Sequence, residues 1–338
     1  MPMETFLEHE PSCLIVGAGI AGLIAARELH RQGVRVLVLE KSRGVGGRMA
    51  SRRFEQGVFD HGTQYFSPSS AWFQSRIHEW TEEGIAREWF RCGHLEVDPR
   101  FISTARYRGH PSMTAIPKFL AVGVDVLTSE KVIHLHVEGN AWHAITEAGN
   151  RYSARACILT APLPQCFELL DASELDREAE CDALRDLRYD PCLTALALCA
   201  AAPDLPEDGV REFPDGPLLR IMDNHRKGIS PDAHAVTIHA SPEFSAAHID
   251  ADPSEWVEEL LAHAAPVLGV EVLARQVHRW RYATVPHPHA EPCVSVHAMP
   301  PLLLAGDAFG EHGVEGAARS GMEAAQFVRQ VFLRRRAW

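Results

Sequence analysis

The stretch CLIVGAGIAG at Cys13–Gly22 decides the fold of the N-terminal part of the chain. Its first four residues are a short apolar run, which is the pattern of a buried parallel strand. A helical pattern follows at 23–31, and a second apolar run at 34–39 leads directly into Glu40. Strand, helix, strand and acid together predict a βαβ unit that binds a dinucleotide.

Each glycine of this unit has a mechanical role. Gly17 permits the tight turn, Gly19 lets the backbone approach a pyrophosphate, and Gly22 allows the helix to pack closely on the strand. The amides and dipole at the helix N-terminus favour the diphosphate, while Glu40 can accept a hydrogen bond from a ribose 2′-hydroxyl. An acid at this position disfavours a 2′-phosphorylated nucleotide. The residues expected to line the diphosphate are Gly17, Gly19, Ile20, Ala21 and Gly22.

Composition and charge narrow the class of protein. The chain has 338 residues, with 33 Lys and Arg against 45 Asp and Glu, and a formal net charge of −12. This acidic balance argues against a nucleic-acid binder, which needs a basic surface. No apolar run is long enough to span a bilayer, so we expect no membrane segment. Residues 1–11 have no basic region typical of a signal peptide, and we expect a cytoplasmic protein.

The spacing of cysteine and histidine predicts no metal site. The eight cysteines are scattered without a CxxC pair, so neither a disulfide framework nor a zinc site is indicated. Among the 19 histidines, the pairs His134/His136 and His287/His289 have the spacing of metal ligands, but we find no carboxylate or cysteine partner at ligand spacing. We interpret both pairs as solvated or core histidines.

A second loop, RGVGGRM at Arg43–Met49, follows Glu40 almost directly. Its small residues lie between two arginines, whose guanidinium groups suit phosphate oxygens. The loop resembles the extended FAD-binding signature of the amine oxidase and glutathione-reductase superfamily, whose members carry a GGR segment here. The resemblance implies non-covalently bound FAD as the cofactor. The contacts it implies from this loop are Lys41, Arg43, Gly47, Arg48 and Met49.

The C-terminal part of the chain carries the second half of this FAD-binding signature. LLLAGDA at Leu302–Ala308 is another buried strand, and GVEGAA at 313–318 opens a long helix. In the superfamily a Gly-Asp pair at this point bonds the ribityl chain, and the following helix directs its N-terminus at the flavin edge. The residue at Val132 contacts the adenine end. The further cofactor residues implied are Val132, Gly306, Asp307, Val314, Glu315 and Ala317.

We therefore expect an α/β plus α+β protein, in which a discontinuous Rossmann-like FAD-binding domain carries an inserted substrate domain on a mostly antiparallel sheet. The expected FAD-binding domain comprises 10–68, 106–165 and 296–338, and the substrate domain comprises 69–105 and 166–295. Hairpins are expected from 124–127 with 132–137 and then 142–146, and a buried strand at 156–162. In the substrate domain we expect strands at 193–199, 218–222 and 235–240 and a helix at 253–265.

Two further segments narrow the resemblance. DHGTQYF at Asp60–Phe66 and HRWRYA at His278–Ala283 look like segments of the bacterial renalase-like flavoproteins, a branch of the amine oxidase superfamily. The likeness runs over roughly 13–331. It implies an FAD oxidase of the 2- and 6-dihydro isomers of NAD(P)H: hydride passes to flavin N5, NAD(P)⁺ forms, and dioxygen becomes hydrogen peroxide. Such a donor needs no general base, which agrees with the lack of a recognisable triad.

The same resemblance places the substrate beside the 60–66 segment. Gly62, Thr63 and Gln64 are expected to lie along the flavin, where Gln64 bonds a carboxamide. Aromatic side chains are expected to wall the ring pocket, with core packing as the alternative role. The substrate residues expected are His61, Gly62, Thr63, Gln64, Tyr65, Tyr189, Trp280 and Tyr282, of which His61 and Gly62 also contact the cofactor.

Three other functions remain open on the same motifs. An amine oxidase commonly uses a lysine near flavin N5, and none of the four lysines of this chain lies in a motif that we place there. A desaturase or isomerase of an isoprenoid would usually show a membrane-facing apolar helix, which we do not find. A flavin-binding module without activity is disfavoured only by the shaped substrate domain.

Overall fold

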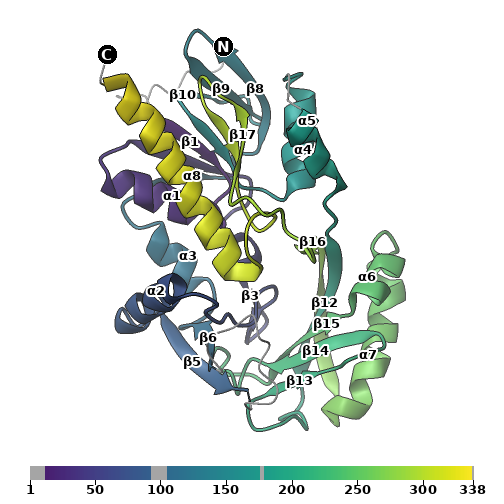
Figure 1. Ribbon diagram of the computed structural model, residues 1–338. Coiled ribbons are helices and arrows are strands. Elements are labelled where there is room, and N and C mark those ends of the chain that lie inside the picture. Colours follow the sequence, from purple (N-terminus) through teal and green to yellow (C-terminus); the bar gives the residue numbers. More distant parts are fainter. Residues whose placement is uncertain (1–11, 93–104, 176–178, 337–338) are drawn as a thin grey trace. The chain divides into compact units, whose positions relative to one another are not determined.

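The computed structural model describes residues 12–92, 105–175 and 179–336. The chain divides into two compact units, and each unit is assembled from separate stretches of sequence (Figure 1). Unit 1 comprises residues 1–47, 117–188 and 285–338. Unit 2 comprises residues 48–116 and 189–284.

Unit 1 is built on a six-stranded sheet in the order β17-β18-β11-β1-β2-β7. All pairs in it are parallel except the edge pair of β17 and β18. The central strands β1, β2, β11 and β18 are almost entirely buried, as expected of a parallel sheet that is covered on both faces. The strands are β1 (Cys13–Val16), β2 (Val36–Glu40), β7 (Asp125–Thr128), β11 (Cys157–Leu159), β17 (Val294–His297) and β18 (Leu302–Leu304).

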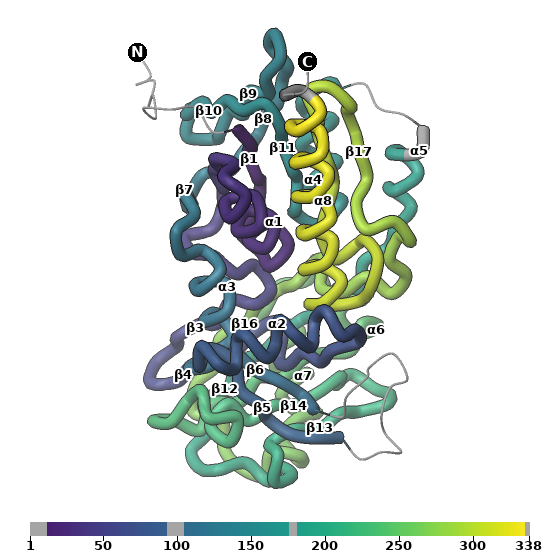
Figure 2. The backbone as a smooth tube through the Cα atoms, turned by 60° about the vertical axis from the view of Figure 1, so that its left-hand side comes forward, coloured from purple at the N-terminus to yellow at the C-terminus, as the bar shows by residue number. Residues whose placement is uncertain are grey.

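Two helices from opposite ends of the sequence lie side by side in unit 1, α1 (Ile20–Arg31) and α8 (Gly313–Arg336), as Figures 1 and 2 both show. A Cβ at Gly321 would lie only 2.1 Å from the carbonyl oxygen of Ala21, so the two backbones can approach this closely only with glycine there. Further helical segments are η1 (Gly47–Met49), α3 (Ala115–Leu120), α4 (Leu163–Ala172), α5 (Ala179–Asp182) and η2 (Ala183–Asp186).

A three-stranded antiparallel sheet completes unit 1, in the order β10-β9-β8. It contains β8 (Val132–Glu138), β9 (Ala141–Thr146) and β10 (Arg151–Ala154). The expected pairing of 124–127 with 132–137 is wrong, because β7 pairs in parallel with β2 in the large sheet. The second expected hairpin is confirmed, since β8 pairs with β9 around the turn at Gly139 and Asn140. The short strand β7, which precedes the hairpin in the sequence, thus forms an edge of the six-stranded sheet.

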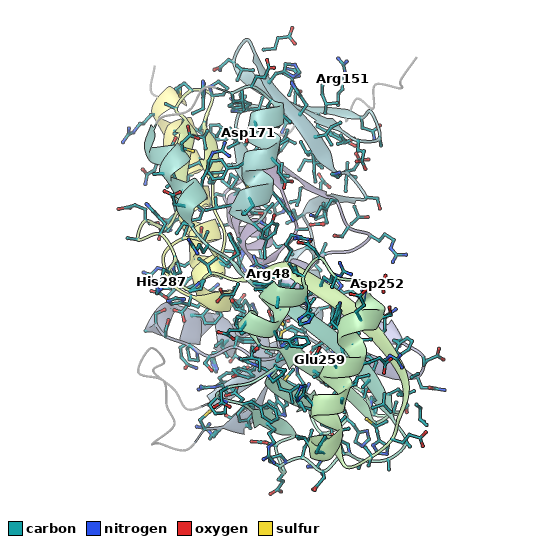
Figure 3. The ribbon with its side chains drawn as sticks, turned by 90° about the vertical axis from the view of Figure 1, so that its right-hand side faces the viewer. Arg48, Arg151, Asp171, Asp252, Glu259 and His287 are labelled. Carbon is teal, nitrogen blue, oxygen red and sulfur yellow. The ribbon has the colours of Figure 1, made fainter. Side chains whose placement is uncertain are left out.

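Unit 2 contains a five-stranded antiparallel sheet in the order β13-β14-β15-β12-β16. Helix α7 begins after the N-cap Asp252, whose side chain accepts from Ser254 N, and Figure 3 shows Asp252 at its start and Glu259 further along. Trp256 and Leu260 of this helix are fully buried in the core of the sheet. The elements are β12 (Asp190–Cys199), β13 (Val210–Glu212), β14 (Leu218–Asp223), β15 (Ala235–Ala240), β16 (Val272–Thr284), α6 (Pro242–His248) and α7 (Pro253–Leu268).

The observed units differ from the expected domain boundaries at several places. Residues 48–68 and 106–116 belong to unit 2, because the β3–β4 hairpin buries Phe59 against Leu196 and Ala235 of the five-stranded sheet. Residues 166–188 and 285–295 belong to unit 1. Residues 93–104 of the expected substrate domain lie outside the described residues. The remaining elements of unit 2 are β3 (Ser51–Phe54), β4 (Gly57–Asp60), α2 (Ala71–Glu82), β5 (Ala86–Arg91) and β6 (Ala105–Gly109).

The expected fold class is confirmed: a Rossmann-like parallel sheet is combined with antiparallel sheets, and each unit is built from separate segments of the chain. Among the helices of the described ranges, none is both long and apolar enough to cross a bilayer.

Candidate active site

The glycine turn between β1 and α1 is constrained by the packing of unit 1. A Cβ at Gly22 would lie 2.0 Å from the carbonyl oxygen of Gly17, and a Cβ at Gly17 would lie 2.7 Å from Thr160 Oγ1. Gly17 also has a φ of +109°, which residues with a side chain rarely adopt. At Gly19, by contrast, a Cβ would meet no described atom within 4 Å. Gly17 and Gly22 are required by the fold, whereas Gly19 leaves open space beside its backbone, which fits a bound diphosphate.

Glu40 ends β2 and holds the two loops of the nucleotide site together. One oxygen of its buried carboxylate accepts from Ala18 N at 2.7 Å, and the other accepts from Ser42 N at 2.7 Å. Gly46 N donates to Ala18 O at 2.8 Å, so the second loop folds back onto the glycine turn. Each carboxylate oxygen keeps further acceptor capacity. The bond from Glu40 to a ribose hydroxyl stays a prediction on this geometry.

The second loop presents basic side chains at the surface of unit 1. Arg43 and Lys41 are both exposed, and Lys41 Nζ donates to Gln165 Oε1 at 2.8 Å. A Cβ at Gly47 would lie 3.6 Å from Gly19 Cα, which shows how close the two loops come. Basic groups and two glycine-rich loops therefore meet at the C-terminal ends of the parallel strands, where open α/β sheets bind their ligands.

Arg48 is the first residue of unit 2, and its side chain forms hydrogen bonds within that unit. Its Nη1 donates to the carbonyl oxygens of Tyr282 and Ala283, each at 3.2 Å, and Figure 3 labels this residue. The backbone oxygen of Arg48 accepts from Thr63 N at 2.8 Å, and the neighbouring Met49 is buried. Arg48 thus ties the segment at 62–63 to the end of β16. Contact of Arg48 and Met49 with the cofactor stays a prediction.

The C-terminal arm of unit 1 carries the Gly-Asp pair at the end of β18. Gly306 has a φ of +142°, and its N–H donates to Ser320 Oγ of α8 at 2.8 Å. Asp307 is half-buried beside it. A Cβ at Gly316 would lie 1.7 Å from the carbonyl oxygen of Glu311, so the start of α8 packs backbone on backbone. The other predicted cofactor contacts in unit 1 lie at the starts of α1, β8 and α8, and are Ile20, Ala21, Val132, Val314, Glu315 and Ala317.

In unit 2 a buried ion pair supports the 60–66 segment. Lys227 Nζ lies 2.7 Å from Asp60 Oδ2, and neither side chain has exposed area. The other carboxylate oxygen of Asp60 accepts from Ser51 Oγ at 2.5 Å and from Met113 N at 3.0 Å. Burial lowers the pKa of Lys227, and the adjacent Asp60 carboxylate partly opposes this. Sequence reasoning missed Lys227, because no local pattern marks a lysine that becomes buried by pairing with a residue 167 positions away.

The amide of Gln64 is already bonded within unit 2. Its Nε2 donates to Asp60 O at 2.5 Å and to Gly62 O at 3.1 Å, and its Oε1 accepts from Lys227 Nζ at 3.3 Å. Both amide protons are therefore directed at the backbone of its own loop. A bond from Gln64 to a substrate carboxamide stays a prediction, and it would have to form at the remaining lone pair of the oxygen or by exchange of a loop contact.

Three histidines and one tryptophan surround the backbone of residue 61; His61 and His239 are buried, and His278 and Trp280 are half-buried. The His61 ring lies 5.0 Å from the Trp280 ring and 4.9 Å from the His278 ring, centroid to centroid. Trp280 Nε1 donates to His61 O at 2.9 Å, and His239 Nε2 lies 3.2 Å from the same oxygen. At Gly62 a Cβ would lie 2.2 Å from Arg48 O and 3.1 Å from Trp280, so only glycine fits there. We call His61, His239, His278 and Trp280 the His–Trp cluster.

The three imidazoles of the His–Trp cluster are neutral at physiological pH. Burial lowers the pKa of His61 to about 3 and that of His239 to about 3. Burial, together with the nearby Arg52 guanidinium, lowers the pKa of His278 to about 4. His239 comes from β15 and was not among the predicted site residues; His278 lies in the quoted HRWRYA segment but was not singled out. His239 and His278 come close to His61 because of the register of the strands that carry them, and this register cannot be read from the sequence.

The remaining predicted aromatic residues form two separate groups in unit 2. Tyr189 and Tyr282 meet edge to face with ring centroids 5.5 Å apart. Tyr65 has its hydroxyl 2.9 Å from Glu212 Oε1 and 3.2 Å from Arg220 Nη1, and its ring lies under the Arg106 and Arg220 guanidinium groups. Burial raises the pKa of Tyr65. Of the four predicted rings, Trp280 alone joins the His–Trp cluster.

These arrangements define what each unit can do chemically. Unit 1 offers a glycine turn with open space at Gly19, an anchored acid and a helix start, which suit a dinucleotide cofactor. Unit 2 offers neutral aromatic rings packed around His61, which directly follows the buried ion pair of Asp60 and Lys227. Imidazoles with so low a pKa do not deliver protons at neutral pH. The chemistry of each unit suits a reaction in which a cofactor carries the electrons and the protein orients the reactants.

Comparison with known proteins agrees with these features. Residues 15–77 match the model of the NAD(P)-binding Rossmann-like domain, and residues 105–329 match that of flavin containing amine oxidoreductase. Renalase of Mus musculus is 23% identical over 350 residues, covering 94% of this chain and 98% of that protein. Flavin-containing amine oxidase B of Sus scrofa is 27% identical over 163 residues, covering 48% of this chain and 28% of that protein.

A solved structure of putrescine oxidase bound to putrescine shares the fold. Its TM-score is 0.70 at 16% sequence identity, and the match covers 95% of this chain and 99% of that one. The amine oxidoreductase model alone spans more than half of the residues of this chain. The chain therefore belongs to the flavin-containing amine oxidoreductase family and is an FAD-dependent oxidoreductase with a renalase-like sequence.

Proposed function

We propose that this protein is an oxidase of dihydronicotinamide dinucleotides, acting on the 2- and 6-dihydro isomers of NAD(P)H. The reaction takes one dihydronicotinamide, one proton and one dioxygen, and yields NAD(P)⁺ and hydrogen peroxide. Bound FAD supplies the acceptor for the hydride and the route of its electron pair to dioxygen. The protein supplies orientation, exclusion of water and a suitable electrostatic environment.

The observation that carries the proposal is the packing of the His–Trp cluster, in which the Trp280 ring lies 5.0 Å from the ring of the buried His61. Loss of hydride leaves a positive charge on the nicotinamide ring, and a protonated imidazole beside it would oppose that charge. Burial holds the pKa of His61 at about 3, so its ring stays neutral. Trp280 offers an aromatic face and is fixed by its hydrogen bond to His61 O. The likeness to mouse renalase along nearly the whole chain supports the same activity.

We further propose that FAD is bound without a covalent link. Burial raises the pKa of Cys166 to about 12 and that of Cys192 to about 11, so these thiols are protonated and weakly nucleophilic at neutral pH. Acid precipitation of the yellow protein tests this directly. Release of all flavin into the supernatant is expected, whereas a yellow pellet would contradict non-covalent binding.

Amine oxidation is the second candidate, and the structure supplies a specific reason to keep it. No lysine lies in a sequence motif that we place near the flavin, yet Lys227 contacts Gln64 in the segment predicted to lie along that ring. Lys227 is, however, paired with Asp60 and fully buried. The ion pair gives Lys227 a role in holding the loop, which does not require an amine substrate.

The experiment is a stoichiometry measurement in air. The purified FAD-loaded protein is mixed with isomerised dihydronicotinamide dinucleotide, with ordinary 4-dihydro NADH, and with a panel of primary and secondary amines. We expect equal amounts of isomer consumed, NAD(P)⁺ formed and hydrogen peroxide formed, with little turnover of 4-dihydro NADH. Peroxide formation from amines alone would reject the proposal and support the second candidate.

A further inference from the structure

The outer face of the β8–β9 hairpin in unit 1 carries a compact group of imidazoles and a carboxylate. His136 and His143 lie opposite each other in the strand register, and their rings stack with centroids 5.1 Å apart and an interplanar angle of 16°. Glu138 follows His136 by two residues and thus projects from the same face of the strand. Its Oε2 lies 4.0 Å from His143 Nε2.

We propose that His136, Glu138 and His143 form a binding site for one divalent transition-metal ion, with Zn²⁺ as the representative ion. One ligand atom from each residue lies within 4.8 Å of the others. Bonds of about 2.0–2.1 Å to a tetrahedral ion place ligand atoms about 3.3 Å apart. Closing that difference requires rotation of the Glu138 side chain, which is 78% exposed, and of the two half-buried imidazole rings, which must turn out of their stacked arrangement toward the ion.

The donor set selects the class of ion. Two imidazoles with one carboxylate suit Zn²⁺, Cu²⁺ and Ni²⁺, whereas Mg²⁺ and Ca²⁺ prefer sites made of oxygen atoms. Three protein ligands leave one tetrahedral position for water. The half-buried histidines and the exposed carboxylate leave the group accessible from solvent. None of the three residues is among the predicted cofactor or substrate contacts, although Val132 of the same strand β8 is.

The burial and charges around His136 favour its neutral imidazole, which is the form that binds a metal ion. Burial lowers the pKa of His136, and neighbouring His143, His134 and Arg151 act in the same direction, while Glu138 opposes them. A metal ion binds the neutral imidazole, so a lowered pKa reduces competition from protons. Arg151 lies on β10, next to β9, and is labelled in Figure 3. Its positive charge opposes a cation, and the carboxylate of Glu138 acts in the opposite direction.

The proposed site differs from the expectation that the chain has no metal site, which stays untested. The pair His134/His136 was dismissed for lack of a carboxylate or cysteine partner, but Glu138 and His143 supply partners in the folded hairpin. The ligand that completes the set comes from the neighbouring strand, seven residues after His136. The spacing of residues along the sequence does not identify two ligands that the register of neighbouring strands brings together.

The test is calorimetric titration of Zn²⁺ into the FAD-loaded protein at neutral pH. We expect one saturable equivalent in the wild type, and at least about 100-fold weaker binding in His136→Ala and in His143→Ala. Glu138→Gln should weaken binding less, and Arg151→Gln should strengthen it. His263→Ala is the matched control, because His263 is exposed on α7 of the other unit and should leave the titration unchanged.

A second readout identifies the ligands. Cu²⁺ added at one equivalent should show an electron paramagnetic resonance spectrum with coupling to two nitrogen atoms, reduced in His143→Ala. Unchanged flavin content and circular dichroism establish that the variants fold. The proposal is overturned if the wild type binds no Zn²⁺, or if the double variant His136→Ala/His143→Ala binds it as tightly as the wild type.

Discussion

The ammonium group of Lys227 lies 2.7 Å from a carboxylate oxygen of Asp60, and both side chains are completely buried. Asp60 is the last residue of β4 and Lys227 follows β14, so the pair joins two distant parts of unit 2. The segment that begins at Asp60 continues into His61 and Gly62, which belong to the predicted substrate site. The ion pair therefore fixes the start of the segment on which the proposed chemistry depends.

Loss of the lysine charge should destabilise the protein strongly. Lys227→Met leaves the Asp60 carboxylate buried without its partner, and we expect a loss of about 3–5 kcal/mol in the free energy of unfolding. Urea denaturation followed by circular dichroism measures this. Lys131→Met is the matched control, since Lys131 forms an exposed pair with Glu147 and its loss should leave the unfolding midpoint unchanged. Equal midpoints for both variants would contradict a structural role for the buried pair.

Two glycines of the nucleotide turn should respond differently to the same substitution. Gly22→Ala places a Cβ 2.0 Å from a backbone oxygen and should prevent stable folding. Gly19→Ala meets no described atom within 4 Å, so the flavin-free protein should keep its thermal midpoint. It should bind FAD at least about tenfold more weakly, because the methyl group occupies the ligand side of the turn. A fluorescence titration with FAD checks this, and full affinity in Gly19→Ala would place the diphosphate elsewhere.

Stability should fall as the solution becomes acidic. The pKa of His61 and His239 is about 3 and that of His278 is about 4 in the folded protein, below the value of 6.5 for a free imidazole. Below about pH 6.5 the unfolded chain binds these protons and the folded chain does not, so the stability present above that pH is lost as the pH falls toward 4.

The size of this loss should depend on the buried imidazoles. Each contributes up to about 1.4 kcal/mol per pH unit to the slope. Urea denaturation at a series of pH values should give a smaller slope for His239→Gln than for the wild type. His263→Gln, on the exposed face of α7, should leave the slope unchanged. A wild-type stability that stays constant from pH 6.5 to pH 4.5 would show that the His–Trp cluster is not buried in neutral form.

The indole of Trp280 should affect substrate binding more than stability. Trp280→Phe keeps a ring but removes the donor to His61 O, and we expect a stability loss of about 1 kcal/mol. KM for the dihydronicotinamide isomer should rise several-fold, because the His61–Gly62 backbone is less well fixed. Trp80→Phe is the matched control: Trp80 is buried in α2, so the substitution should lower stability and leave KM unchanged. The reverse pattern would assign Trp280 to core packing.

Most of the predicted nucleotide-binding turn could be read from the sequence, because the residues that determine its structure lie close together in the chain. Gly17 and Gly22 follow one strand within ten residues, and their packing roles are visible in the motif. The sequence did not reveal Lys227 or His239, because each reaches the 60–66 segment from a distant part of the chain, Lys227 from the turn after β14 and His239 from β15. The β7 strand was misassigned to a hairpin for the same reason, since its partner β2 lies far back in the chain. Long-range pairing, rather than local propensity, decides these positions.

The most direct test of the proposed activity is a single-turnover measurement without oxygen. The FAD-loaded protein is mixed in a stopped-flow instrument with a slight excess of the 2- or 6-dihydro isomer, and the flavin absorbance is followed in time. The proposed activity predicts rapid bleaching with one NAD(P)⁺ formed per flavin, and no comparable bleaching by amines. Rapid bleaching by an amine, with the flavin unchanged by both dihydronicotinamide isomers, would contradict it.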